Sequence, residues 1–128
     1  MLLDTSVIAE IFRSPSTSKR FRKIVKEIGD EEVYVSMLQL AEVADWAVRN
    51  RVSSKDRVAA IKEFARIMPL NEQICLDAPI IKHRRRELGY LDFGLLDAIV
   101  LATARSIGQR VLTFDRNFAE ESDCLVIS

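Results

Sequence analysis

The stretch Met1-Leu2-Leu3-Asp4-Thr5-Ser6 decides how the rest of the chain is interpreted. Its three apolar residues stop abruptly at a carboxylate and two hydroxyls, which is typical of a short buried strand that ends in a turn. Thr5 and Ser6 are good helix N-cap residues, and the spacing of apolar side chains predicts a helix over residues 7–12. We therefore expect Asp4 at the carboxyl end of a central strand, the edge where open parallel sheets bind ligands.

The same pattern returns near the other end of the chain, where Val111-Leu112-Thr113-Phe114 runs into Asp115. Two aspartates at strand ends predict one shared acidic site. Between them, strand patterns alternate with helix patterns, which predicts an α/β fold with a parallel sheet covered on both faces. The expected strands cover residues 33–35, 67–70 and 124–127, and the expected helices cover residues 19–28, 37–51, 54–66, 71–88 and 92–107, with Pro79 kinking or splitting the fourth of these helices.

Composition narrows the class of protein without naming a substrate. The 128 residues predict a single domain, and 19 basic against 19 acidic residues give no overall field toward nucleic acid or membrane. Cys75 and Cys124 match no zinc or redox spacing and are expected as buried free thiols. With no signal peptide pattern and no apolar run of ~18 residues, we expect a cytoplasmic protein that does not enter a membrane.

Asp97 is the most informative acid, because it is the only charged residue between Phe93 and Ala102. Its helical neighbours include Val100 and Leu101, so its side chain is expected within an apolar surface. An ionised carboxylate in such a place is costly unless it is paired or binds a metal. The alternative is a structural acid that is bonded to an arginine or to free backbone amides.

Three further acids share this ambiguity. Glu42 lies on a helix face with Leu38 and Trp46 and is expected to point inward, although a surface acid paired with a cation is the alternative. Asp4 alone could cap the following helix, and Asp115 alone could be a turn residue before Asn117. A single metal site accounts for all four acids at once.

Carboxylates without a cluster of histidines or cysteines suit hard cations such as Mg²⁺ and Mn²⁺. Two such ions about 3.5–4 Å apart can activate water and stabilise the leaving oxygen in phosphodiester hydrolysis. Other chemistries are poorly supplied. The only histidine, His83, lies in a basic run, which disfavours a Ser-His-Asp triad, and no glycine-rich phosphate loop follows the first strand.

Four ordered motifs then point to a family. They are Leu3-Asp4-Thr5-Ser6-Val7, Ser36 with Ala41-Glu42-Val43, the stretch from Asp97 to Ala104, and the stretch from Leu112 to Phe118. In this order and spacing the chain resembles the PIN-domain ribonucleases, and among them the VapC-type toxins of prokaryotic toxin–antitoxin pairs.

The resemblance implies a three-layer α/β/α sandwich with a five-stranded parallel sheet. It also implies a Mg²⁺ or Mn²⁺ site built from Asp4, Glu42, Asp97 and Asp115, with Ser6 as a polar helper and Asn117 as a weaker candidate. The resemblance further implies a homodimer and, for a toxin, inhibition by a small antitoxin protein encoded nearby.

Three functions follow from these observations as hypotheses. The first is a metal-dependent endoribonuclease that acts as a toxin, and the second is an RNA-binding or regulatory module that cleaves little. The third, an aspartyl-phosphate phosphatase with Asp4 as nucleophile, lacks the expected second acid, because Ser6 occupies its position. The basic run of residues 82–86 supplies RNA-binding candidates, with a solvated helix face as the alternative. These candidates are Arg84, Arg85 and Arg86.

Overall fold

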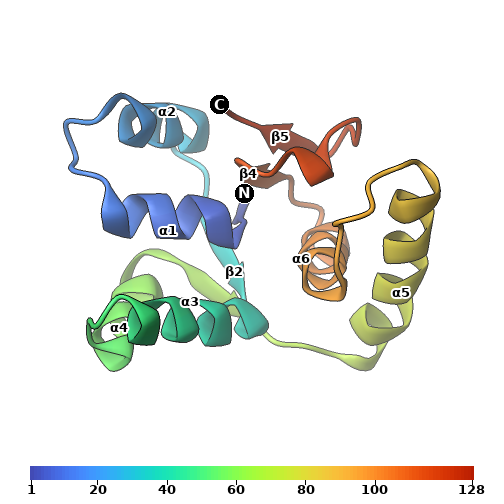
Figure 1. Ribbon diagram of the computed structural model, residues 1–128, viewed down its shortest axis with the longest axis horizontal. Helices are drawn as coiled ribbons and strands as arrows, with labels where there is room; N and C mark the ends of the chain where they lie inside the picture. Colours follow the sequence, from blue (N-terminus) through green and yellow to red (C-terminus); the bar gives the residue numbers. More distant parts are fainter.

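A five-stranded parallel sheet forms the centre of the molecule, with strand order β3-β2-β1-β4-β5 (Figure 1). The structure is a computed structural model that describes residues 1–128. Every neighbouring pair of strands is parallel, and Leu2 of the central strand lies opposite Tyr34 on one side and Val111 on the other. The strands are β1 (Leu2–Leu3), β2 (Tyr34–Ser36), β3 (Arg66–Met68), β4 (Val111–Thr113) and β5 (Cys124–Val126).

Six α-helices cover the two faces of this sheet. Helices α1 to α4 pack on one face, and α5 and α6 pack on the other, so the predicted three-layer α/β/α sandwich is confirmed (Figure 1). The helices are α1 (Thr5–Arg13), α2 (Lys19–Ile28), α3 (Met37–Arg49), α4 (Ser54–Phe64), α5 (Glu72–Glu87) and α6 (Leu95–Ser106), and a 3₁₀ helix, η1 (Arg116–Phe118), follows β4.

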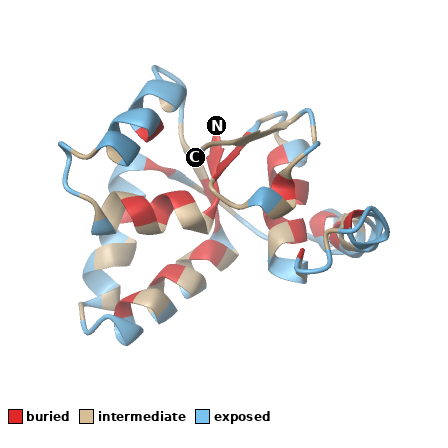
Figure 2. Ribbon diagram, turned by 45° about the horizontal axis from the view of Figure 1, so that its top comes forward, coloured by how far each residue is buried: buried red, intermediate tan, exposed pale blue.

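The alternation of side chains along the strands divides the core into two clusters. Leu2 and Val111 belong to the cluster under α5 and α6, whereas Leu3 and Leu112 belong to the cluster under α1 to α4. Successive strand residues point to opposite faces, so a sheet covered on both faces needs uninterrupted apolar runs. Figure 2 shows the resulting concentration of buried residues in the central strands and on the inner faces of the helices.

The order of the strands creates a crevice beside Asp4. The chain passes from β1 to β2 and β3 on one side and then crosses to β4 and β5 on the other. The point where the strand order reverses therefore lies between the carboxyl ends of β1 and β4, which is where open α/β sheets bind ligands. Asp4 follows the first of these strands, and Asp115 lies two residues beyond the second.

Sequence patterns located every α-helix and strand, with shifts at several ends; β3, for example, covers Arg66–Met68 rather than residues 67–70. Helix α6 begins at Leu95 rather than near residue 92, because Gly94 is extended with a φ of −97° and a ψ of 177°. Helix α5 continues through Pro79 without a split, and that residue lies on the exposed side of the helix. Cys75 lies on the same exposed side, so its predicted burial is wrong, while Cys124 is half-buried. None of the helices has the length and apolar character needed to cross a membrane.

Candidate active site

Asp4 is a buried carboxylate, 6% exposed, held by two hydroxyl groups. Ser6 Oγ donates to Asp4 Oδ2 over 2.7 Å, and Thr113 Oγ1 donates to the same oxygen over 2.8 Å. Although Asp4 occupies the N-cap position of α1, its side chain makes no capping hydrogen bond. Its carboxylate is therefore fixed by β4 and by the first turn of α1, with Oδ1 left without a side-chain partner.

The two hydroxyls are themselves oriented by the backbone that leaves β4. The Phe114 amide donates to Ser6 Oγ over 3.1 Å, and the Asp115 amide donates to Thr113 Oγ1 over 2.9 Å. A hydroxyl that accepts an amide hydrogen keeps its single proton for one donation, and both protons go to Asp4. Sequence reasoning identified Ser6 but missed Thr113. The sequence feature that could have identified Thr113 is that it is a polar residue in an otherwise apolar strand.

Glu42 reaches the site from α3 and is held by a third hydroxyl, that of Thr5. Thr5 Oγ1 donates to Glu42 Oε1 over 2.9 Å. Gln39, which is fully buried, donates to the Leu3 carbonyl over 2.7 Å and to Thr5 Oγ1 over 3.3 Å. The Gln39 side chain also accepts the Ser36 amide, which completes a capping box at the start of α3. Gln39 thus ties the start of α3 to the end of β1, which places Glu42 beside Asp4.

Asp97 enters from the first turn of α6. Its Oδ2 accepts the Gly94 amide over 2.8 Å, and no arginine or lysine pairs with it. The alternative prediction of bonding to a free backbone amide is therefore partly right, whereas pairing with a cation is wrong. The amide bond occupies one oxygen of the carboxylate and fixes its orientation.

Asp115, after the end of β4, also accepts a backbone amide with one carboxylate oxygen. Its Oδ1 accepts the Asn117 amide over 2.8 Å and caps η1, as the turn alternative predicts. Asn117 itself makes no side-chain hydrogen bond, and its carbonyl oxygen accepts a hydrogen bond from Arg85. Asp97 and Asp115 each use one carboxylate oxygen to accept a backbone amide, and each keeps the other oxygen free of that contact.

Burial and neighbouring carboxylates both disfavour the ionised form of three of these acids. Burial raises the pKa of Asp97 to about 6, and repulsion from Asp4, Asp115 and Glu42 adds to this rise. Burial also raises the pKa of Asp4 and of Glu42 above their ordinary values. None of the four acids forms an ion pair. The structure therefore gathers negative charge at the β1–β4 crevice without a cation to balance it.

This donor set fits a hard divalent cation. No three His, Cys, Asp or Glu side chains form a ready-made metal-binding group, so the structure shows a cluster of acids but no complete set of ligands. Mg²⁺ needs only one or two carboxylates and keeps several waters, so an open arrangement of carboxylate oxygens suits it. A pocket of about 540 Å³ opens beside Glu42, and its lining includes Thr5, Ser6, Trp46 and Leu96.

The prediction that the basic run on α5 binds RNA is wrong for Arg85, because this side chain is buried. Its side chain is 1% exposed, stacks 3.8 Å from the Tyr90 ring centroid and pairs with Glu121 over 3.2 Å. It also donates to the carbonyl oxygens of Asn117 and, over 2.7 Å, Ala119. Arg85 therefore holds the loop after η1. Successive helical residues point in different directions, so Arg84 is exposed, and Arg86 donates to the Phe93 carbonyl over 3.0 Å.

A comparison with protein families decides the identity. The sequence profile of the PIN domain matches residues 1–122. This chain belongs to the PIN-domain family. PIN domains are in general nucleases, that is, hydrolases that act on nucleic acid, and in general they use divalent metal ions. The use of divalent metal ions in this family is consistent with the unpaired carboxylates of this PIN domain.

Solved structures show the same fold over nearly the whole chain. A toxin–antitoxin complex from Klebsiella pneumoniae has a TM-score of 0.75 at 21% identity and covers 98% of this chain and 95% of that chain. FitAcB from Neisseria gonorrhoeae has a TM-score of 0.72 at 24% identity, covering 99% and 96%. VapBC-1 from nontypeable Haemophilus influenzae has a TM-score of 0.73 at 18% identity, covering 98% and 96%. No curated protein sequence gives a significant match.

Proposed function

We propose that this PIN domain is a Mg²⁺- or Mn²⁺-dependent endoribonuclease that acts as the toxin of a toxin–antitoxin pair. The observation that carries the proposal is the group of four carboxylates at the β1–β4 crevice, none of which has a cationic partner. Buried, mutually repelling acids lower the stability of a fold, so their presence supports a function that requires them.

The chain's own residues divide the work between holding and orienting. Asp4, Glu42 and Asp97 would hold the ion directly, and Asp115 would hold a second ion or act through water. The chemistry that divalent ions supply at such a site is activation of a water nucleophile and stabilisation of the leaving oxygen of a phosphodiester. Ser6 and Thr113 keep Asp4 in place, so this carboxylate does not have to reorganise during the reaction.

Two protein partners belong to the proposal. The similar structures from Klebsiella pneumoniae and Haemophilus influenzae are a toxin–antitoxin complex and VapBC-1, which supports an antitoxin as partner in the cytoplasm. A homodimer is supported by exposed apolar side chains on α5 and in the loop that follows it. These are Leu76, Ile80, Leu88 and Leu91, each more than half exposed.

The test is cleavage of single-stranded RNA by the purified protein with Mn²⁺, with excess EDTA, and with Asp4→Asn. We expect cleavage only with the wild-type protein and metal. RNA binding without cleavage under every condition would favour the RNA-binding module instead. Full cleavage in excess EDTA would exclude the metal mechanism while leaving a nuclease. Hydrolysis of small phosphomonoesters, with no effect on RNA, would favour the phosphatase.

A further inference from the structure

A second pocket lies next to the acidic crevice, on the same edge of the sheet. It has a volume of about 530 Å³ and is lined by Arg20 of α2, by Phe114 and Arg116 after β4, and by Ile127 after β5. Phe114 and Arg116 flank Asp115 in the sequence, so each is a single peptide unit, ~3.8 Å between Cα atoms, from a residue of the acidic site. We call this hollow the Arg20–Arg116 pocket.

Arg20 is held in position but keeps free donor groups. Its guanidinium lies 4.3 Å from the centroid of the Phe114 ring, and its side chain is 50% exposed. Its nearest acid is Glu10, at 3.5 Å. Glu10 is itself buried and already accepts hydrogen bonds from Arg13 and Ser14. The planar guanidinium presents five N–H donors, so most of them remain available for an anion.

Arg116 is exposed and forms no ion pair. Ser128, which also lines the pocket, already accepts a hydrogen bond of 2.6 Å from Lys23 Nζ. Arg116 therefore faces the pocket unpaired, and Arg20 shares its one acid, Glu10, with Arg13.

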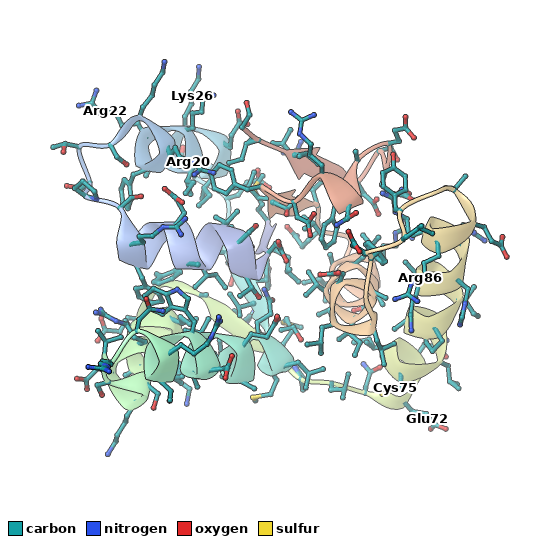
Figure 3. The ribbon with its side chains drawn as sticks, viewed as in Figure 1. Arg20, Arg22, Lys26, Glu72, Cys75 and Arg86 are labelled. Atoms are coloured by element: carbon teal, nitrogen blue, oxygen red, sulfur yellow. The ribbon has the colours of Figure 1, made fainter.

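The placement of Arg20 is unusual among the cations of α2. Five of the ten residues of this helix are lysine or arginine. Figure 3 shows Arg22 and Lys26 pointing away from the body of the molecule, whereas Arg20 lies against it, beside β4. Arg22 and Lys26 are therefore matched controls of the same charge on the same helix.

We propose that the Arg20–Arg116 pocket binds a phosphate of the RNA strand next to the phosphodiester at the acidic site, an inference that rests on the proposed function. The chain has no net charge, and four carboxylates line the catalytic crevice. A polyanion therefore gains no attraction from the whole molecule, and nearby cations must position it. Arginine suits this task, because its fork of donors matches the oxygens of a phosphate.

The experiment measures binding of a labelled single-stranded RNA at several salt concentrations in EDTA, together with cleavage kinetics in Mn²⁺. The variants are Arg20→Gln, Arg116→Gln and their combination, with Arg22→Gln plus Lys26→Gln as the control of equal charge. Each lost phosphate contact should lower the salt slope by ~0.7. The pocket double variant should bind at least about tenfold more weakly. Its KM should rise with little change in kcat, since the contact is made before and during the reaction.

The outcomes separate the pocket from the nuclease. Equal salt slopes and affinities for the pocket and control double variants, with RNA still cleaved, would overturn the pocket alone. A wild-type protein that neither binds nor cleaves RNA would overturn both proposals. Arg116→Gln guards against a folding effect, because this side chain has no partner to lose, and unchanged thermal unfolding would verify that.

Discussion

Thr113 Oγ1 donates a hydrogen bond of 2.8 Å to Asp4 Oδ2, although 109 residues separate the two in the sequence. The same hydroxyl accepts the Asp115 amide over 2.9 Å. The Thr113 side chain therefore fixes both the carboxylate of Asp4, after β1, and the backbone of Asp115, after β4. Two halves of the candidate site share this hydroxyl.

Replacing Thr113 by valine should affect both stability and cleavage. Valine keeps the shape of threonine, but Asp4 loses a donor and the Asp115 amide loses its acceptor, at a cost of about 1–3 kcal/mol. Thr103→Val is the matched control, because that buried hydroxyl only donates to the Ile99 carbonyl within α6. Urea unfolding and RNA cleavage measure the two effects. Equal cleavage by both variants would remove Thr113 from the site.

Asp97→Asn should separate a metal ligand from a structural acid. The substitution removes a charge that burial and three neighbouring acids disfavour, so the metal-free variant should be as stable as the wild type or more stable. Mn²⁺ should raise the melting temperature of the variant less than that of the wild type. Cleavage should fall by at least ~10²-fold. A variant that is less stable without metal and gains equally from Mn²⁺ would show that Asp97 is not a ligand.

The same carboxyl predicts a pH dependence with a definite sign. Its pKa is about 6 in the folded protein against an ordinary value of 3.8, so the folded state binds more protons between these values. In metal-free protein the Asp97 contribution to stability should therefore fall as the pH rises from about 4 to about 6. The stability of Asp97→Asn minus that of the wild type should increase over this window. A pH-independent difference in urea unfolding would contradict the prediction.

Arg85 and Arg84 should differ sharply when each is replaced by lysine. Arg85→Lys keeps the charge but loses the planar fork that holds Ala119 and Glu121, so it should destabilise the fold by about 2 kcal/mol or more. Arg84→Lys, in an exposed position, should change stability by no more than about 0.5 kcal/mol. Similar shifts in the two melting temperatures would refute the difference.

Whether the exposed part of the basic run contacts RNA needs charge removal. If Arg84 or Arg86 contacts a phosphate, its replacement by alanine should lower the salt slope of RNA binding by ~0.7. The comparison variant is Lys82→Ala, which removes a positive charge from the same helix. An unchanged slope in both arginine variants would leave α5 with a solvated basic face.

The proposed homodimer is tested on α5. Ile80 is 61% exposed there, and Val48 on α3 is a similarly exposed apolar residue elsewhere. Ile80→Glu should place a charge in the interface and give a monomer, while Val48→Glu should leave the dimer intact. Light scattering at micromolar concentration distinguishes these states. A wild-type protein that is only monomeric would reject the dimer.

The strands and acids were predictable because local patterns encode them. An apolar run ending at Asp4 or Asp115 identifies a strand and its carboxyl end, and the parallel sheet then brings the two ends together. The isolated charge of Asp97 in an apolar helix was equally visible. These signals need only neighbouring residues and the periods of strand and helix.

The remaining features depend on contacts between distant segments. Burial of Arg85 follows from Tyr90 and from the carbonyl oxygens after η1, which a basic run cannot reveal. The role of Thr113 requires knowing that β4 pairs with β1. The sequence of one strand does not reveal which strand it pairs with. The hydrogen bond from Thr113 to Asp4 could therefore not be assigned from the sequence.

The position of β4 beside β1 also sets the order in which the site is made. Ribosomes add residues from the amino end at ~5–20 per second, so Asp4, Glu42 and Asp97 emerge before Thr113 does. Until then the Asp4 amide lacks its partner, the Leu112 carbonyl, and its carboxylate lacks one hydroxyl. A nascent chain that stalls before residue 111 would carry three of the four acids and no finished centre.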